Sequence, residues 1–457
     1  MAIELLSPAG TIKNMRYAFA YGADAVYAGQ PRYSLRVRNN DFQLENLKAG
    51  IDEAHVLGRK FFVASNLLPH NNKLKRYLEH MQPVIDMQPD ALIMADPGLI
   101  MMVRERWPEI PVHLSVQANT MNWAAVQFWQ SVGISRIILS RELSLDEVEE
   151  IRQQCPDTEL EVFVHGALCV AYSGRCLLSG YFNHRDANQG SCTNACRWKY
   201  GMQEGKEDVS GDVLDATSMQ EVMNPQPFSE SLSSCGGLER HPEADKIYLL
   251  EEENRQGDLM PIMEDEHGTY IMNSRDLRAI EHVERLVKIG VNSLKIEGRT
   301  KSHYYVARTT QLYKKAIDDA VAGKGFDWSL MRKLDALANR GYTDGFYQRR
   351  HTAAHQNYEQ GASLRFNQRF VGELIAYDEI SGLAEFHVKN KFLVGDSVEL
   401  IDPKGNQTFN ISSMIDARKN EATDMVPGSG HRVKIPVPCR PSKEALLAVN
   451  VADKMVC

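Results

Sequence analysis

The chain has 457 residues, 43% of them hydrophobic and 25% charged, and its formal net charge is −8. This composition is that of a globular protein and excludes a fibrous or disordered chain, and no apolar run approaches the roughly 20 residues that cross a bilayer. The first residues, MAIELLSPAG, lack the features of a secretory signal, so we expect a cytoplasmic protein with no membrane segment.

Short apolar runs alternate with segments of helical period through the first three hundred residues. The eight strand-like runs cover residues 3–8, 25–29, 60–68, 91–96, 112–117, 136–140, 160–166 and 292–298. Before the seventh run, Ser144 and Glu147 form a capping-box pattern that marks a helix start. Continuous apolar strands with helical crossovers predict a (β/α)8 TIM-like barrel. An open doubly wound sheet is the alternative, but no G-x-G-x-x-G follows the first strand.

The regular spacing breaks between the seventh and eighth strands, where an insertion runs from about residue 167 to 270. Its later part is polar and turn-rich, so we expect a surface excursion with little core. We place the barrel at residues 1–325, with an amphipathic helix after the eighth strand closing it, and a linker at 326–365. From 366 to 457 the period changes to two, which predicts a small antiparallel β-barrel or sandwich domain.

Four cysteines lie close together at the start of this insertion. Cys169, Cys176, Cys192 and Cys196 have the spacing C-x6-C-x15-C-x3-C. A reducing compartment disfavours disulfides, and clustered thiolates bind zinc or iron–sulfur clusters. Structural zinc sites usually have closely spaced pairs at both ends, whereas here the first pair is loose, so an iron–sulfur cluster is the favoured interpretation and zinc or inert thiols are the alternatives. Cys235, in the same insertion, is a possible replacement ligand.

The end of the eighth strand carries alternating charges. Lys295, Glu297 and Arg299 are two residues apart, so all three point to one side of a strand. At the mouth of a barrel the two cations could clamp a dicarboxylate or a phosphate, with arginine binding in bidentate fashion. The alternative is a salt-bridged layer around Glu297 that has only a structural role.

Other polar residues lie at the ends of predicted strands and in the loop after the second strand. Asp96, Gln117 and His165 are candidates for positioning substrate or moving a proton, although such residues often only satisfy loop backbone. Arg36 and Arg38 lie in a loop that mixes bases with Tyr33 and amides, a composition typical of contacts to single-stranded RNA and also of an ordinary solvated loop.

The segments EVFVHGALC (161–169) and GRCLLS (174–179) resemble the signature of the collagenase-like peptidase family of unknown catalytic type. The resemblance extends to SPAG, AVYAG, DPG, SVQ, SREL and KIEGR, and to the C-terminal β-domain. Within the family, AFAYGADAVYAGQPRYSLRVRNN is most similar to the members that hydroxylate tRNA.

The resemblance implies a fold and an activity. Such members add a hydroxyl group to carbon 5 of the wobble uridine in tRNA, require prephenate, and depend on four cysteines that bind an iron–sulfur cluster, here expected to be [4Fe–4S]. By this resemblance, the cluster ligands in this chain are expected to be Cys169, Cys176, Cys192 and Cys196. The resemblance implies the tRNA anticodon stem-loop and prephenate as partners, and it leaves any electron donor unidentified.

Two other activities remain open at this point. A peptidase is one, because His165 lies four residues before Cys169, but the sequence has no H-E-x-x-H or G-x-S-x-G motif, and a thiolate that binds iron is not a free nucleophile. The other is a cluster-dependent hydroxylation factor for ribosomal RNA or a quinone precursor, since relatives in the family act in this way.

Overall fold

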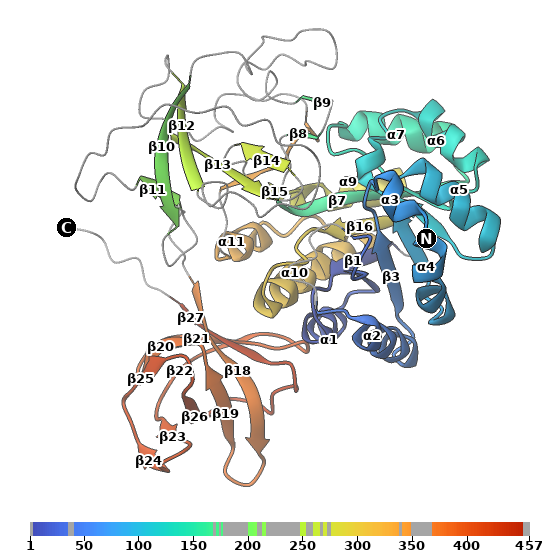
Figure 1. The fold of residues 1–457 in the computed structure, drawn as a ribbon. Helices are drawn as coiled ribbons and strands as arrows, with labels where there is room; N and C mark the ends of the chain where they lie inside the picture. Colours follow the sequence, from blue (N-terminus) through green and yellow to red (C-terminus); the bar gives the residue numbers. More distant parts are fainter. Residues whose placement is uncertain are drawn as a thin grey trace.

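The computed structural model describes residues 3–34, 41–167, 276–337, 341–348 and 368–450, together with short strands between residues 171 and 271. Eight parallel strands close into a barrel in the order β16-β1-β2-β3-β4-β5-β6-β7, with β7 paired to β16 (Figure 1). The predicted (β/α)8 fold is therefore confirmed. The strands are β1 (Glu4–Pro8), β2 (Ala25–Gly29), β3 (Lys60–Ser65), β4 (Ala91–Met94), β5 (Val112–Leu114), β6 (Arg136–Ile138), β7 (Glu159–Ala167) and β16 (Ser293–Ile296).

Helices cover the outside of the barrel (Figure 1). The Ser144 side chain accepts from the Glu147 backbone and the Glu147 carboxylate accepts from the Ser144 backbone, so the predicted capping box is present. No helix among the described residues is long and apolar enough to cross a membrane. The helices are α1 (Ile12–Ala20), α2 (Leu44–Val56), α3 (Asn71–Leu74), α4 (Tyr77–Asp86), α5 (Pro97–Arg106), α6 (Trp123–Ser131), α7 (Leu145–Gln154), α9 (Val283–Ile289), α10 (His303–Val321) and α11 (Ser329–Asp335), with 3-10 turns η2 (Val116–Ala118) and η7 (Ile280–His282).

The insertion contains more regular structure than its composition indicates. Five strands form an antiparallel sheet in the order β11-β10-β12-β13-β14, and β8 pairs with β9. Glycine, Pro261 and acidic residues within these strands weaken their sequence signal. The strands are β8 (Ala171–Tyr172), β9 (Arg175–Cys176), β10 (Tyr200–Glu207), β11 (Val213–Asp215), β12 (Ile247–Glu252), β13 (Leu259–Asp265) and β14 (Gly268–Ile271).

Two further strands extend the barrel sheet beyond β7. The strand β15 (Asp276–Arg278) runs antiparallel to the end of β7, and β17 (Tyr342–Thr343) pairs with β15 in parallel. The sequence predicted neither strand, because each is too short to show a period. They bring the segment around residue 344 next to the end of β7.

The C-terminal region is an antiparallel β-domain, as predicted. Its main sheet has the order β22-β21-β27-β18-β19-β26-β23-β24, and β20 pairs with β25. A separate apolar core includes Val371, Phe386 and Leu447. The strands are β18 (Gln368–Asp378), β19 (Leu383–Val388), β20 (Asn390–Leu393), β21 (Ser397–Ile401), β22 (Gln407–Asn410), β23 (Ile415–Asp416), β24 (Glu421–Ala422), β25 (Met425–Gly428), β26 (Arg432–Pro436) and β27 (Leu446–Asn450).

A buried contact joins this β-domain to the barrel. Arg308 of α10 donates two hydrogen bonds to the Glu399 carboxylate of β21, at 3.1 and 2.8 Å, and its side chain is 2% exposed. Tyr21 of α1 donates to the carbonyl of Ile401 at 2.7 Å. Charged hydrogen bonds in a dry contact have defined geometry, so they fix the β-domain against α1 and α10.

A second contact between the two parts predicts a pH dependence. Glu373 of β18 is reached by His303 at 2.9 Å, Lys13 at 2.5 Å, and His387 and Lys389 at 3.1 Å. The close contact with His303, together with Lys13, His387 and Lys389, holds the pKa of Glu373 well below its usual range. The ionised Glu373 carboxylate therefore stabilises the folded protein fully above the unfolded-state pKa, about 4.3. This stabilisation is lost progressively as the pH falls below that value.

We expect Glu373→Gln to lower the melting temperature at pH 7 and to have a smaller effect as the pH falls below about 4. Thermal unfolding followed by circular dichroism between pH 3 and 8 measures this. Glu379→Gln is the control, since Glu379 pairs with Arg440 and both side chains are more than half exposed. If Glu373→Gln and Glu379→Gln changed the melting temperature equally at every pH, the stabilising role assigned to Glu373 would be wrong.

Candidate active site at the barrel mouth

The carboxyl ends of the eight strands meet at one mouth, where barrels of this kind place their chemistry. The cysteine-bearing segment starts there, since Cys169 lies two residues beyond Ala167, the last residue of β7. Cys169, Cys192, Cys196 and Cys235 lie outside the described residues, and Cys176 falls in β9 without a described side chain. The end of β7, from which the segment continues, is therefore observed at the mouth, while the position of the four cysteines and the ligand set stay predictions.

Arg141 is a residue of the mouth that the sequence analysis did not single out. It follows β6, and its Nη1 donates to the carbonyl oxygen of Ala167 at 2.9 Å. Its guanidinium lies 3.9 Å from the centre of the Phe163 ring, and its Nη2 is 3.7 Å from the Glu297 carboxylate. Arg141 thus anchors the end of β7 from which the cysteine segment starts. The sequence signal that could have identified Arg141 was its position directly after the strand predicted at residues 136–140.

The ends of β7 and β16 approach each other at Gly166. Gly166 has φ +105°, and a Cβ atom there would lie 2.7 Å from both the Cβ and the carbonyl oxygen of Glu297. The Glu297 N–H donates to the carbonyl of His165 at 2.8 Å and holds the two chains at this spacing. Only glycine fits both the backbone conformation and the close approach.

Lys295 lies below the mouth, inside the barrel. Its Nζ donates to the Glu161 carboxylate at 2.8 Å, and the two side chains are 3% and 0% exposed. Arg136 also reaches Glu161, at 3.2 Å, and Glu4. Burial lowers the pKa of Lys295, and the Glu161 carboxylate opposes this effect. Lys295 therefore belongs to a salt-bridged internal layer, centred on Glu161 and not on Glu297.

We expect Lys295→Met to destabilise the protein by about 3 kcal/mol, the lower end for breaking a buried ion pair, because Arg136 still reaches Glu161. Urea unfolding measures the change. Lys295→Met combined with Glu161→Gln completes a double-mutant cycle with the two single variants, and its loss should be smaller than the sum of the two single losses because the pair is broken only once. A loss below about 1 kcal/mol in Lys295→Met alone would contradict a structural role for the pair.

Arg299 and Glu297 lie beyond the end of β16, at the mouth itself. Arg299 Nη1 donates to Ser34 Oγ at 2.6 Å, and the guanidinium is 5.9 Å from the centre of the Tyr27 ring. Ser34 is the last described residue before the loop that contains Arg36 and Arg38, which lies outside the described residues. Arg299 is therefore next to the root of that loop.

The structure gives the other predicted polar residues clear local contacts. Asp96 is the N-cap of α5, and its carboxylate accepts from the Leu99 backbone at 2.8 Å. Gln117 lies in η2, and its side-chain oxygen accepts from Asn66 at 2.6 Å. These contacts stabilise the loops at the mouth, and a role toward substrate stays a prediction for both residues.

His165 packs against α10. The β7–β16 register shifts here, so that Ile296 pairs with His165 and Val164 is skipped. The His165 ring lies 5.4–5.8 Å from the rings of Tyr305, Tyr313 and Tyr342. Its Nδ1 is 3.3 Å from the Tyr313 hydroxyl, and its buried Nε2 has no hydrogen-bond partner. Burial lowers the pKa of His165 to about 3, so its ring is neutral.

The hydrogen bonds of the histidines bear on peptidase chemistry. Among the described residues, histidine side chains pair with carboxylates, tyrosines, Arg32, Lys389 and Gln348, and with no serine or cysteine. Cys155 donates instead to the carbonyl of Trp123, at 3.6 Å. The described part of the chain thus contains no nucleophile–histidine pair of the kind that proteolysis requires.

Comparison with known proteins agrees with this fold. The chain matches the family model "Peptidase family U32" over residues 10–357 and "Peptidase family U32 C-terminal domain" over residues 367–448. The protein, a closed β/α barrel with an appended β-domain, therefore belongs to peptidase family U32.

Its similarity to individual members is high. It is 61% identical to tRNA hydroxylation protein P of Escherichia coli, over 95% of this chain and 94% of that one, and 60% identical to the protein of the same name from Haemophilus influenzae, over 95% and 93%. It is 32% identical to tRNA hydroxylation protein P1 of Bacillus subtilis, over 92% of this chain and 88% of that one.

Proposed function

We propose that this protein is a tRNA hydroxylase that acts on carbon 5 of the wobble uridine and requires prephenate. The observation that carries the proposal is the identity of 60% or more, over nearly the whole chain, to two proteins named for tRNA hydroxylation. The uridine position and the prephenate requirement rest on the resemblance of the sequence motifs. Enzymes that modify a base need it out of its stack, and an anticodon loop presents such a base at low cost.

The barrel mouth supports this proposal through its donor set. Four cysteines within 28 residues begin directly after β7, and thiolates in this number suit an iron–sulfur cluster. Cys169, Cys176, Cys192 and Cys196 would hold the cluster, with Cys235 as a possible replacement. A cluster there would supply redox-active, Lewis-acidic iron beside the extruded base.

The cations of the mouth are the candidate groups for binding anionic substrate. Arg299, which donates to Ser34 at the root of the 35–40 loop, would bind a carboxylate of prephenate or an RNA phosphate, and Arg36 and Arg38 of that loop are further candidates for such contacts. Arg141 holds the end of β7, and Glu297 orients Arg141. Lys295 would support the mouth from the layer below through its ion pair with Glu161.

The proposal is tested by nucleoside mass spectrometry of tRNA and 23S ribosomal RNA from intact, deleted and complemented strains. Any oxygen-dependent enzyme that makes the same nucleoside is removed or deprived of oxygen. We expect 5-hydroxyuridine derivatives to disappear from tRNA in the deleted strain, to return on complementation, and to fall in a strain that makes no prephenate. Unchanged tRNA with a lost ribosomal modification would favour the ribosomal alternative and refute tRNA as the substrate.

A further inference from the structure

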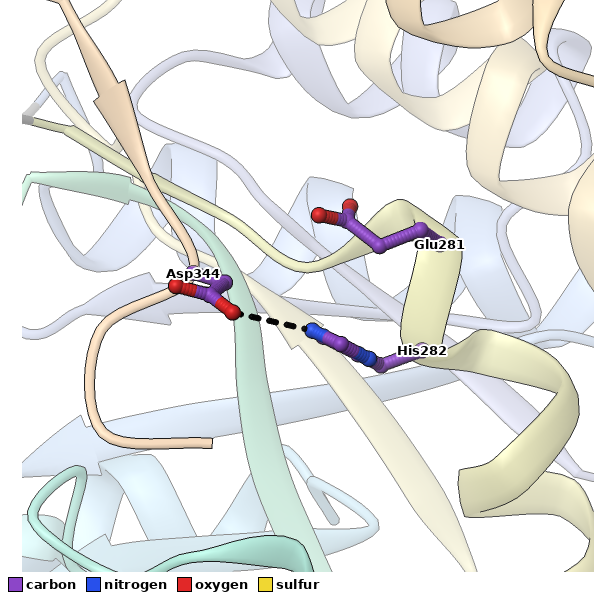
Figure 2. Close-up of side chains that lie close together, drawn as sticks. All are labelled: Glu281, His282 and Asp344. Carbon is purple, nitrogen blue, oxygen red and sulfur yellow. Dashed lines mark hydrogen bonds and ion pairs between the residues drawn. The ribbon is translucent and has the colours of Figure 1, made fainter. Parts of the chain in front are cut away.

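A second group of metal-binding side chains lies away from the cysteine segment. Glu281 and His282 belong to η7, and Asp344 follows β17, so residues that are distant in sequence meet beside the extension of the barrel sheet. One ligand atom from each lies within 4.8 Å of the other two. Figure 2 shows His282 directed at Asp344, with the side chain of Glu281 lying to one side of this pair.

The distance between His282 and Asp344 suits a shared cation. His282 Nε2 is 3.3 Å from Asp344 Oδ2, and two atoms at this separation that bind one ion at about 2.1 Å subtend an angle of about 100°, close to tetrahedral. Gln348 Nε2 is 3.5 Å from the same His282 nitrogen. Rotation of that amide by half a turn would present its oxygen as a fourth ligand.

The surroundings of Glu281 provide an independent observation. Its Oε2 is shielded from solvent and has no hydrogen-bond partner. A carboxylate oxygen that is shielded from solvent and has no donor is costly to the folded state. A cation would satisfy this oxygen, whereas the His282–Asp344 pair alone leaves it unsatisfied.

We propose that Glu281, His282 and Asp344 bind a divalent cation that prefers oxygen and nitrogen ligands, such as Mn²⁺ or Zn²⁺. The ion joins η7 to the segment after β17 and so fixes the edge of the sheet that pairs with the end of β7. Tyr347, three residues after Asp344, donates to the carbonyl of Phe163 and extends this connection to the barrel. The site is separate in sequence from the four cysteines and does not depend on the proposed tRNA activity.

The chain offers a matched control for an ordinary histidine–carboxylate pair. His55 Nε2 lies 3.1 Å from Asp90 Oδ2, which is nearly the same separation, and both side chains are at least 30% exposed. The described residues place no third ligand there, since the only three-residue group found among them is Glu281, His282 and Asp344. The His282–Asp344 pair thus differs from the His55–Asp90 pair in having a third ligand, the carboxylate of Glu281, nearby and in being more buried.

Mn²⁺ is the best probe because it is a hard ion with little preference for thiolates, so the cysteine segment does not compete for it. Binding to the full-length protein is measured by the loss of the free-ion signal in electron paramagnetic resonance. We expect one Mn²⁺ per chain, with Glu281→Gln and Asp344→Asn each weakening binding at least tenfold and His55→Ala leaving it unchanged. Glu281→Gln preserves shape and removes no protein hydrogen bond from Oε2, so its fold should be intact.

Melting temperature gives a second measure of the same binding. Added Mn²⁺ should raise it in the intact chain and in His55→Ala, because a ligand of the folded state stabilises that state, and should have little effect in Glu281→Gln. No Mn²⁺ binding by the intact chain, or equal binding by the intact chain and Glu281→Gln, would overturn the proposal.

Discussion

Replacing Cys169 with alanine is expected to abolish tRNA hydroxylation and to remove most of the bound iron. Cys169 follows the end of β7 by two residues, so among the four cysteines it is the nearest in sequence to the barrel strands. A cluster that loses one of four thiolates has an open iron and is held less tightly. The measurement is 5-hydroxyuridine in tRNA from a deleted strain that expresses the variant, together with the iron and sulfide content of the variant purified without oxygen.

Cys155→Ala is the matched control for that experiment. Cys155 is also at the end of an element, but it is a buried free thiol that caps α7 and donates to the carbonyl of Trp123. We expect it to retain iron and hydroxylation, with a stability loss of about 1 kcal/mol for its weak hydrogen bond and small cavity. Normal tRNA hydroxylation by Cys169→Ala would show that the cluster assignment is wrong.

The second large effect is expected for Gly166→Ala. Its φ of +105° costs an alanine roughly 1–2 kcal/mol, and the contact with the Glu297 backbone at 2.7 Å adds roughly 1–3 kcal/mol because neither strand end moves freely. The displaced strand end is also the start of the cysteine segment, so iron content should fall together with stability. Chemical denaturation and iron analysis of the purified variant measure both.

Gly290→Ala is the control that separates the cost of the backbone conformation from the cost of the close contact with Glu297. Gly290 ends α9 with φ +86°, and no atom lies within 4 Å of the position that an added Cβ would take, so only the conformational cost of about 1 kcal/mol applies. Iron content should be normal in this variant. Equal destabilisation by the two substitutions would mean that the close approach of β7 to β16 contributes nothing.

The barrel was predictable because its strands are buried on both faces and form continuous apolar runs in the sequence. Residues 25–29 were predicted as a strand and form β2 with the same bounds. The strands of the insertion were missed, since glycine, proline and charge interrupt them, and β15 and β17 were missed because two or three residues show no period. The end of the seventh strand, just before Cys169, was predicted at residue 166 and lies at Ala167, while the position of the cysteines themselves stays a prediction.

Side-chain directions at the mouth were harder to predict. Strict alternation placed Lys295, Glu297 and Arg299 on one side, and Lys295 and Arg299 do lie near the same Tyr27 ring, but Lys295 lies deeper in the barrel, paired with Glu161. The register shift between β7 and β16 skips Val164 and so places a bulge in β7. The same bulge turns His165 toward α10. A bulge is set by tertiary packing and has no local sequence signal.

Hydroxylation by the purified chain tests the central claim most directly. Protein purified without oxygen is incubated with tRNA from the deleted strain, prephenate, and an extract of that strain to supply any electron donor. The tRNA is then analysed by mass spectrometry. We expect 5-hydroxyuridine at the wobble position with the intact protein, and none when the chelator-treated protein or the Cys169→Ala variant replaces it. Wobble uridine that remains unmodified with the intact, iron-loaded protein would contradict the account.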